Sequence, residues 1–299
     1  MCSNFNNMPP AFKTVAVIGR YNTAEIAESL LGLAGLLQQR GCKVLIEKET
    51  AANIGKNGFA TGDYAAIGAE ADLAVVLGGD GSMLSAARHL AVHGVPLVGV
   101  NQGRLGFMTD IARDEMLAGV QQLLDGRFSI ESRVLLEAEV WRDGGRVFRH
   151  LALNDVVVNK GDIGRMIEMK VEVDGTFLYL LRADGMIVCT PTGSTAYALS
   201  ANGPILHPKL AGIGIVPLCP HALSNRPITI SDDSRVDITL VSPSEGRIHF
   251  DGQSRFDGRA GDCVRITAAS IRVTLLHPPR YDYFAMLREK LHWSEMPEP

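Results

Sequence analysis

The stretch Leu77–Leu84 places three glycines around one carboxylate, that of Asp80. Glycine has no Cβ, so its backbone can approach a ligand closely or adopt unusual φ values. The run Asp72–Leu77 predicts a buried parallel strand and Ser82–His93 predicts a helix, whose first N–H groups and dipole favour phosphate. Because Asp80 would repel a phosphate, the turn predicts chemistry as well as binding. A plain tight turn with Ser82 as N-cap is the alternative that stays open.

A second polar cluster follows the run Arg182–Gly185 and a short apolar strand. It covers Thr190–Pro204, where Pro191 and Gly193 predict a sharp turn and neighbouring threonines and serines offer hydroxyl and N–H groups at the start of a short helix. Such a nest suits the phosphate and ribose groups of a dinucleotide. A helix cap alone explains two of the hydroxyl groups, but it does not explain three of them together with Tyr197 and Asp184.

Two shorter motifs carry weaker signals. Asn154-Asp155 precedes the apolar run Val156–Val158, and an amide beside a carboxylate can accept from sugar hydroxyls and read an adenine edge. A turn or strand-start role stays open for this dipeptide. Phe250–Gln253 ends a strand and offers a further polar group, although alone it indicates only a hairpin turn.

The first half of the chain alternates strands with helices. This order predicts an open parallel sheet, in which ligands bind beyond the carboxyl ends of the strands. We therefore expect the Asp80 turn and the loop Asn101–Phe107 to face one crevice, while Gly55–Asp63 is expected to be a loop. The other expected elements are strands at Lys13–Gly19, Lys43–Glu47 and Pro96–Val100, and helices at Thr23–Arg40 and Asp114–Asp125.

From about Ile130 the hydrophobic period changes to strict alternation. That pattern predicts a second, antiparallel domain with one solvated face. Tyr281–Trp293 is expected to dock as an amphipathic helix through Phe284, Leu287 and Leu291. The expected strands are Val134–Trp141, Arg146–Asn159, Ile167–Val173, Phe177–Arg182, Val236–Val241, Arg247–Phe250, Cys263–Thr267 and Ile271–Leu276, with hairpin turns at Asp143–Gly145 and Asp174-Gly175.

Composition is that of an ordinary soluble globular protein with two domains: 299 residues, 46% hydrophobic and 21% charged. A net charge of −4 argues against nucleic acid or an anionic membrane as the main partner, and no apolar run has the length of a membrane span. Met1–Phe12 is expected to be a loose tail and not a signal peptide. The five cysteines form no C-x-x-C pair, which favours a reducing cytoplasm over disulfides or structural zinc.

Taken together, the motifs resemble the NAD kinases in order and spacing over Thr14–Trp293. The Gly-Gly-Asp-Gly turn alone is shared with diacylglycerol kinases and 6-phosphofructokinases, whereas the run Thr190–Tyr197 is far more discriminating. The resemblance implies an α/β N-terminal domain with an open parallel sheet, a β-rich C-terminal domain and a terminal helix that returns to the first domain. It divides the chain into a flexible tail at 1–12, an ATP-binding domain at 13–129 plus 281–296, and an NAD-binding domain at 130–280.

What the resemblance implies is transfer of the ATP γ-phosphoryl group to the 2′-hydroxyl of the adenosine ribose of NAD, giving NADP and ADP. Asp80 would be the general base, and the phosphate loop would comprise Gly78, Gly79, Gly81 and Ser82. The divalent metal, Mg²⁺ or Mn²⁺, would be bound through ATP and not by a protein cage. The enzyme would be a cytoplasmic homo-oligomer, dimer or tetramer. The residues that would contact NAD are Asp80, Gly81, Phe107, Asn154, Asp155, Arg165, Arg182, Asp184, Thr195, Ala196, Tyr197, Ser200, Asn225 and Gln253.

Two departures from the family pattern keep the chemistry: Ser82 stands where many relatives have threonine, and Asp155 where many have glutamate. The alternatives are a kinase for another small alcohol or a lipid on the same glycine turn, and a non-catalytic NAD(H)-binding sensor. The sensor is expected to lack the carboxylate that Asp80 provides. A dehydrogenase would carry Gly-x-Gly-x-x-Gly after Gly19, which is missing, and Gly55-Lys56-Asn57 does not make a Walker A motif.

Overall fold

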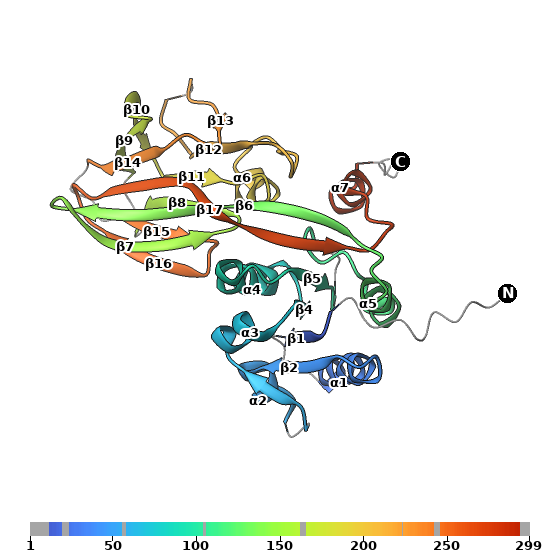
Figure 1. Cartoon of the computed structure of the whole chain (residues 1–299). Helices are drawn as coiled ribbons and strands as arrows, with labels where there is room; N and C mark the ends of the chain where they lie inside the picture. Colours follow the sequence, from blue (N-terminus) through green and yellow to red (C-terminus); the bar gives the residue numbers. More distant parts are fainter. Residues whose placement is uncertain are drawn as a thin grey trace. The chain divides into compact units, whose positions relative to one another are not determined.

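The computed structural model describes residues 12–19, 24–55, 58–103, 106–161, 166–222, 224–241 and 246–293 (Figure 1). It divides into two compact units, unit 1 with residues Met1–Ser132 and Val273–Pro299, and unit 2 with Arg133–Arg272. The chain passes from one unit to the other within two long strands, β6 (Ser129–Arg142) and β17 (Cys263–His277). The assignment of ATP to residues 13–129 and 281–296, and of NAD to residues 130–280, stays a prediction about ligands.

Unit 1 contains the predicted parallel sheet, with its first five strands in the order β3-β2-β1-β4-β5. All five residues of β4 are buried, as expected where both faces of a parallel sheet are covered. The order reverses between β1 and β4, which is where open α/β sheets bind ligands beyond the strand ends. The strands are β1 (Thr14–Gly19), β2 (Lys43–Glu47), β3 (Ala60–Gly62), β4 (Leu73–Leu77) and β5 (Leu97–Val100).

Two elements of unit 1, a short edge strand and the start of a helix, differ from what the hydrophobic pattern predicted. The segment expected to be a loop, 55–63, includes the three-residue edge strand β3, which is too short to show alternation, and its residues 56 and 57 lie outside the described part. The helix after the glycine turn begins at Asp80, with Gly79 and not Ser82 as its N-cap. The helices are α1 (Ala24–Gln39), α2 (Lys48–Ile54), α3 (Tyr64–Glu70), α4 (Asp80–Leu90), α5 (Met116–Leu124) and α7 (Tyr283–Leu291).

The core of unit 1 is formed by apolar side chains of β1, β2, β4, β5, α1 and α5. Phe12, at the end of the predicted tail, packs against it, and residues 1–11 lie outside the described part. The terminal helix α7 belongs to this unit, so its predicted return is confirmed. It buries Met286 and Leu287, whereas Phe284 is 58% exposed, so that part of the predicted docking face was wrong.

Unit 2 is antiparallel and β-rich, as predicted. One sheet has the order β13-β12-β11-β8-β15-β16, and its apolar side chains share a core with those of β6, β9, β10, β14 and β17. Its strands are β8 (Asp155–Lys160), β11 (Gly185–Cys189), β12 (Gly212–Leu218), β13 (Ile228–Ser231), β15 (Gly246–Phe250) and β16 (Ser254–Gly258). The remaining strands are β7 (Gly145–Ala152), β9 (Ile167–Val173), β10 (Thr176–Ala183) and β14 (Val236–Leu240).

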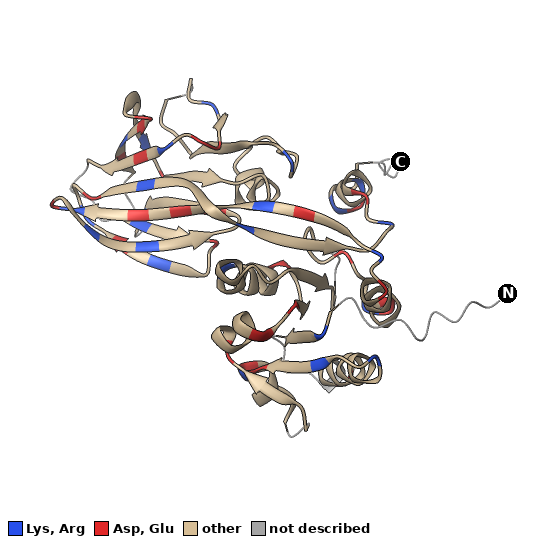
Figure 2. Ribbon diagram, in the orientation of Figure 1, with Lys and Arg blue, Asp and Glu red and all other residues tan. Residues whose placement is uncertain are grey.

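The run Arg146–Asn159, predicted as one strand, is divided into β7 and β8. The break falls at Leu153-Asn154, immediately before Asp155, so a candidate site dipeptide lies where one strand ends and another begins. Charged residues of both signs lie on the strands of this unit, as Figure 2 shows, and adjacent strands pair some of them, for example Arg146 with Glu139. Within the described residues no helix is long and apolar enough to cross a membrane.

Candidate functional site

The glycine turn of unit 1 connects β4 to α4 and is fixed by backbone hydrogen bonds. The N–H of Gly78 donates to the carbonyl of Val100 on β5 (2.9 Å), and the carbonyl of Gly79 accepts from the N–H of Ser82 (3.0 Å). Among the described residues with positive φ, none belongs to this turn, so unusual φ values are not the reason for its glycines. A Cβ on Gly79 would meet no atom within 4 Å. The glycine leaves open space beside the start of the helix.

Asp80 joins this turn to the loop that follows β5. Its Oδ2 accepts the N–H of Phe107 (2.8 Å) and its Oδ1 accepts the N–H of Met108 (2.9 Å). The structure thus brings together two of the predicted segments, the Asp80 turn and the Phe107 loop, whose residues 104 and 105 lie outside the described part. Each carboxylate oxygen keeps a second lone pair, so the half-buried Asp80 can still accept a proton or a hydroxyl.

Glycines allow the Phe107 loop to approach Asp80 so closely. A Cβ on Gly106 would lie 2.2 Å from Oδ1 of Asp80, and a Cβ on Gly99 would lie 2.4 Å from the carbonyl oxygen of Met108. The buried Oγ1 of Thr109 and both polar side-chain atoms of Gln102 have no hydrogen-bond partner among the described residues. Because buried polar groups are nearly always satisfied, these atoms indicate a polar ligand or water at this loop.

In unit 2, Asn154 and Asp155 lie at a corner that is held from two sides. On one side the carboxylate of Asp251 accepts the N–H groups of Leu153, Asn154 and Asp155 at 3.0, 2.7 and 3.2 Å. On the other side Thr190 donates its hydroxyl to the carbonyl of Leu153 (2.5 Å) and its N–H to that of Asn154 (2.9 Å). The corner and the Thr190 turn, two predicted segments, are therefore in direct contact.

Two carboxyl groups, those of Asp155 and Asp251, lie close together at this corner. Asp155 is 4% exposed, and burial together with the nearby charge of Asp251 raises the pKa of Asp155 to about 7. Burial, and then the charge of Asp155, raises the pKa of the neighbouring Cys189 thiol to about 12. Near neutral pH, Asp155 is therefore divided between a form that donates a hydrogen bond and a form that only accepts. The buried Oδ1 of Asn154 has no partner among the described residues.

The sequence suggested that the hydroxyl groups of the Thr190 turn face a ligand, but in the structure some of them are bonded inside the protein. Ser194 is buried and donates to the carbonyl of Pro191 (2.6 Å) while it accepts the N–H of Leu206 (2.9 Å). The buried hydroxyl of Thr192 accepts from Nη1 of Arg133 (3.1 Å). These groups hold the turn, because their hydrogen bonds are made inside the protein. The more exposed positions of the run are Thr195, Ala196, Tyr197 (47% exposed) and Ser200.

Of the other predicted residues, Asp184 lies away from this corner. Asp184 pairs with Lys160 (2.7 Å) and precedes β11, whereas Asp155 pairs in register with Cys189 at the far end of the same strand, about 16 Å away at 3.3 Å per residue. Arg182 is exposed on β10, Gln253 is exposed beside Asp251, and Asn225 is half-buried. Arg165 lies outside the described residues. Asp184 is thus not brought to the Asn154 corner within one chain.

Sequence reasoning missed Asp251 and Lys160. Asp251 was visible only as part of an Asp-Gly hairpin turn, and the N–H groups that it binds are 96 to 98 residues away along the chain. Lys160 directly follows the predicted strand Arg146–Asn159 and belongs to none of the motifs. In neither case does the local sequence contain a signal that identifies the partner.

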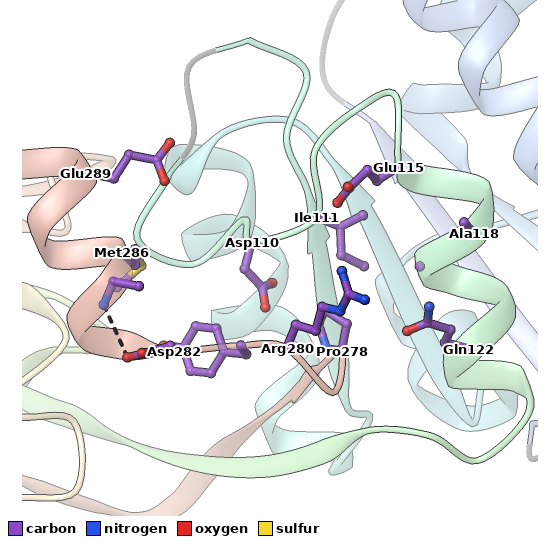
Figure 3. A pocket seen from close by; sticks show the side chains of 13 residues that line it. Asp110, Ile111, Glu115, Ala118, Gln122, Pro278, Arg280, Asp282, Met286 and Glu289 are labelled. Atoms are coloured by element: carbon purple, nitrogen blue, oxygen red, sulfur yellow. Dashed lines mark hydrogen bonds between the residues drawn. The ribbon is translucent and has the colours of Figure 1, made fainter.

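A cavity of about 430 Å³ in unit 1 contains none of the predicted site residues (Figure 3). It is lined by α5, α7 and the segment before α7, with Asp110, Glu115 and Glu289 among its charged groups. Beside it, His277 is hydrogen-bonded to Asp110 (3.0 Å) and Glu131 (2.9 Å). Burial lowers the pKa of His277, but these two hydrogen bonds outweigh it and the pKa is raised. In the described part of the chain, no three His, Cys, Asp or Glu side chains are grouped to hold a metal.

Comparisons with known proteins agree with the motifs. Residues 15–128 match the ATP-NAD kinase N-terminal domain, and residues 153–277 match the ATP-NAD kinase C-terminal domain. The chain is 61% identical over 291 residues to an NAD kinase of Aromatoleum aromaticum, covering 97% of each chain. It is 60% identical to an NAD kinase of an Azoarcus species, covering 97% of this chain and 99% of that one.

Solved structures show the same fold. The yeast NADH kinase, in a crystal structure with NADH, superimposes with a TM-score of 0.88 at 25% identity, covering 98% of this chain and 90% of that one. An NAD kinase from Archaeoglobus fulgidus in complex with ATP gives a TM-score of 0.73 at 22% identity, covering 93% of this chain and 98% of the other. At that lower identity the likeness concerns the fold alone.

Proposed function

The chain belongs to the NAD kinase family, and from that premise we propose that it transfers the γ-phosphoryl group of ATP to the 2′-hydroxyl of the adenosine ribose of NAD, giving NADP and ADP. The observation that carries the proposal is a carboxylate in the first turn of α4, beside an open glycine turn. A helix start binds phosphate, and a carboxylate placed there can accept a proton from a hydroxyl that attacks the phosphate. A lipid kinase and a non-catalytic sensor are not favoured by the relatives.

In the proposed reaction, Asp80 accepts the proton of the 2′-hydroxyl as the ribose oxygen bonds to the γ-phosphorus. The bond between that phosphorus and the β,γ-bridging oxygen breaks, and ADP leaves. The positive end of the α4 dipole stabilises charge on the phosphates. Because such transition states are loose, positioning supplies most of the rate enhancement, and the base contributes about 10²- to 10⁴-fold.

ATP is proposed to arrive as its complex with Mg²⁺ or Mn²⁺. A metal that neutralises the phosphate oxygens needs only a few protein ligands, because it keeps several waters and substrate oxygens. We expect chelation of the metal to abolish turnover and not to unfold the protein.

NAD is proposed to bind through the corner of unit 2. The Oδ1 of Asn154, buried without a partner in the described structure, is an acceptor for a ribose hydroxyl or an adenine amino group. Asp155 would complete this recognition, with Thr195, Ala196, Tyr197 and Ser200 nearby. The assignments of Gly81, Phe107, Arg165, Arg182, Asp184, Asn225 and Gln253 to NAD stay predictions.

We further propose a cytoplasmic homo-oligomer. The described cysteines, Cys42, Cys189, Cys219 and Cys263, are free, as expected in a reducing compartment. Among the described strands, β10 pairs with β9 alone, and it exposes Phe177, Leu178 and Leu180, which would be covered in an assembly. Light scattering coupled to size exclusion would distinguish a dimer or tetramer from a monomer.

One coupled assay tests the function. The purified protein is incubated with ATP, Mg²⁺ and NAD, and NADP is detected with an NADP-specific dehydrogenase, with reactions lacking ATP or NAD as controls. A panel of other alcohols and lipid acceptors is run in parallel with radiolabelled ATP. Formation of NADP and not of other phosphorylated products is expected. A folded protein that forms no NADP would refute the proposal.

A further inference from the structure

The carboxylate of Asp251 lies beneath the corner that carries Asn154 and Asp155. We propose that Asp251 is a positioning residue of the NAD site, which fixes the backbone of residues 153–155 so that the side chains of Asn154 and Asp155 can bind NAD. This inference rests on the proposed function and extends it to a residue that contacts no substrate. Asp251 belongs to the turn between β15 and β16, far from the corner along the chain.

Three backbone N–H groups depend on this one side chain. Asp251 is buried, and its two oxygens accept the N–H groups of residues 153, 154 and 155 at 2.7 to 3.2 Å. In return the N–H of Asp251 donates to the carbonyl of Asp155 (3.0 Å). A charged acceptor forms stronger hydrogen bonds than a neutral one, and it satisfies several donors at once. Its removal would leave these N–H groups without an acceptor inside the protein.

Asp251 holds an uncommon backbone conformation at this position. Its φ is +52°, and that of the following Gly252 is +63°. A residue with a Cβ rarely adopts this left-handed conformation, although aspartate tolerates it better than most. The turn aims the carboxylate across to the start of β8, where Phe250 pairs in register with Val156. Positive φ values also occur at Asp143-Gly144 and Asp174-Gly175, as expected for Asp-Gly hairpin turns, so the positioning role rests on the hydrogen bonds of the carboxylate.

The opposite side of the corner is equally constrained, which leaves only side chains for a ligand. Thr190 binds the carbonyls of Leu153 and Asn154, and a Cβ on Gly193 would lie 2.0 Å from the carbonyl oxygen of Asn154. With N–H groups bound to Asp251 and carbonyls bound to Thr190, the backbone has no freedom to turn. The orphaned Oδ1 of Asn154 is an independent indication that a ligand completes this corner.

The charge of Asp251 gives the test a second readout. The titratable groups that interact with Asp155 are Asp251 and the thiol of Cys189. Burial and the charge of Asp251 raise the pKa of Asp155 to about 7, so the KM for NAD should change with pH near neutrality. Loss of the Asp251 charge should lower that pKa and move the midpoint of the pH dependence to lower pH. A purely structural contact would not move it.

The experiment compares wild type with D251N, which keeps the shape but loses the charge, and with D251S, which is smaller. D262N is the matched control, because Asp262 is a buried carboxylate of the same unit that is bonded to Arg142 (2.8 Å). We expect the KM for NAD to rise about 10- to 100-fold in both Asp251 variants, the equivalent of one charge-assisted hydrogen bond. The KM for ATP should stay within about twofold, as for a loss of binding confined to NAD.

The outcomes separate this inference from the proposed function. If wild type forms NADP and either folded Asp251 variant keeps both its KM for NAD and its pH midpoint, the inference is overturned and the function stands. If wild type neither forms NADP nor binds NAD in calorimetry, the function and the inference both fail. If D262N raises the KM for NAD as much as D251N does, the effect is general destabilisation of unit 2 and the positioning role is refuted.

Discussion

Asp80 in unit 1 and Asp251 in unit 2 both hold a loop through backbone N–H groups, yet they leave different capacity for chemistry. Asp80 binds two N–H groups, of Phe107 and Met108, and stays half-buried beside open space. Asp251 binds three and is buried. A carboxylate with fewer donors and access to solvent can take a proton from a substrate, whereas one enclosed by donors can only hold the backbone.

Asp155 completes the comparison, because it is a buried acid beside the charge of Asp251. Donors stabilise a charged carboxylate, whereas burial and a like charge favour the protonated form. The proposed base, Asp80, has two backbone donors and access to solvent, whereas Asp155, proposed to bind NAD, shares its corner with another acid. Identical side chains differ in role because the two units surround them differently. The following variants test that contrast, in order of expected effect.

Replacing the proposed base should have the largest effect. We expect Asp80→Asn to lower kcat about 10²- to 10⁴-fold, because the amide cannot accept the proton, while NAD still binds. The KM for NAD and its calorimetric affinity check the second part. The matched control is Asp63→Asn, which alters a carboxylate at the N-cap of α3 in the same unit (Oδ1 to the N–H of Ala66, 2.9 Å) and should keep full turnover. Loss of NAD binding with an intact fold would make Asp80 a binding residue.

Displacing Asp80 without removing it should have a smaller effect. A Cβ on Gly106 would collide with Oδ1 of Asp80, so Gly106→Ala must push the carboxylate or the loop aside. We expect kcat to fall about 10- to 100-fold, since shifts near 1 Å have effects of this size. Gly103→Ala, in the same loop, is the control, because a Cβ there meets no atom within 4 Å. Equal kcat values for the two variants would show that the contact does not position the base.

Neutralising Asp155 should affect binding and stability in opposite directions. The pKa of Asp155 is about 7 in the folded state against an ordinary 3.8. Between about pH 4 and 7 the carboxyl must therefore take up a proton when the chain folds, so its contribution to the free energy of unfolding falls as pH rises. Asp155→Asn should therefore raise the free energy of unfolding by as much as about 4 kcal/mol at pH 8, at 1.4 kcal/mol per pH unit, and by little near pH 4. Urea denaturation at the two pH values measures this.

The same variant should raise the KM for NAD about tenfold, because the amide cannot become a charged acceptor. The contrast with Asp262→Asn is informative: hydrogen bonds to Arg142 help to lower the pKa of Asp262 despite its burial, so that change should destabilise unit 2 at pH 8. If Asp155→Asn stabilises the protein over wild type no more at pH 8 than at pH 4, the carboxyl is not held in an unfavourable ionised state.

The sequence by itself determined most of the elements and the family. Apolar runs between glycine turns specified the parallel strands β1, β2, β4 and β5, strict alternation specified the antiparallel unit, and the motifs identified the NAD kinases. These features are local, since periodicity and turn chemistry depend on residues a few positions apart. The same local evidence also located Asp80 at the start of a helix, although it named the wrong N-cap.

Only the tertiary structure decided what each polar group does. Ser194 and Thr192 were expected to face a ligand, but their hydroxyls are used inside the turn, because Leu206 and Arg133 reach them from elsewhere in the chain. Asp251 was expected to form a hairpin turn, but it holds a corner nearly a hundred residues away. Hydrogen-bond partners at such separations are set by the packing of strands against one another, and no local pattern contains that information.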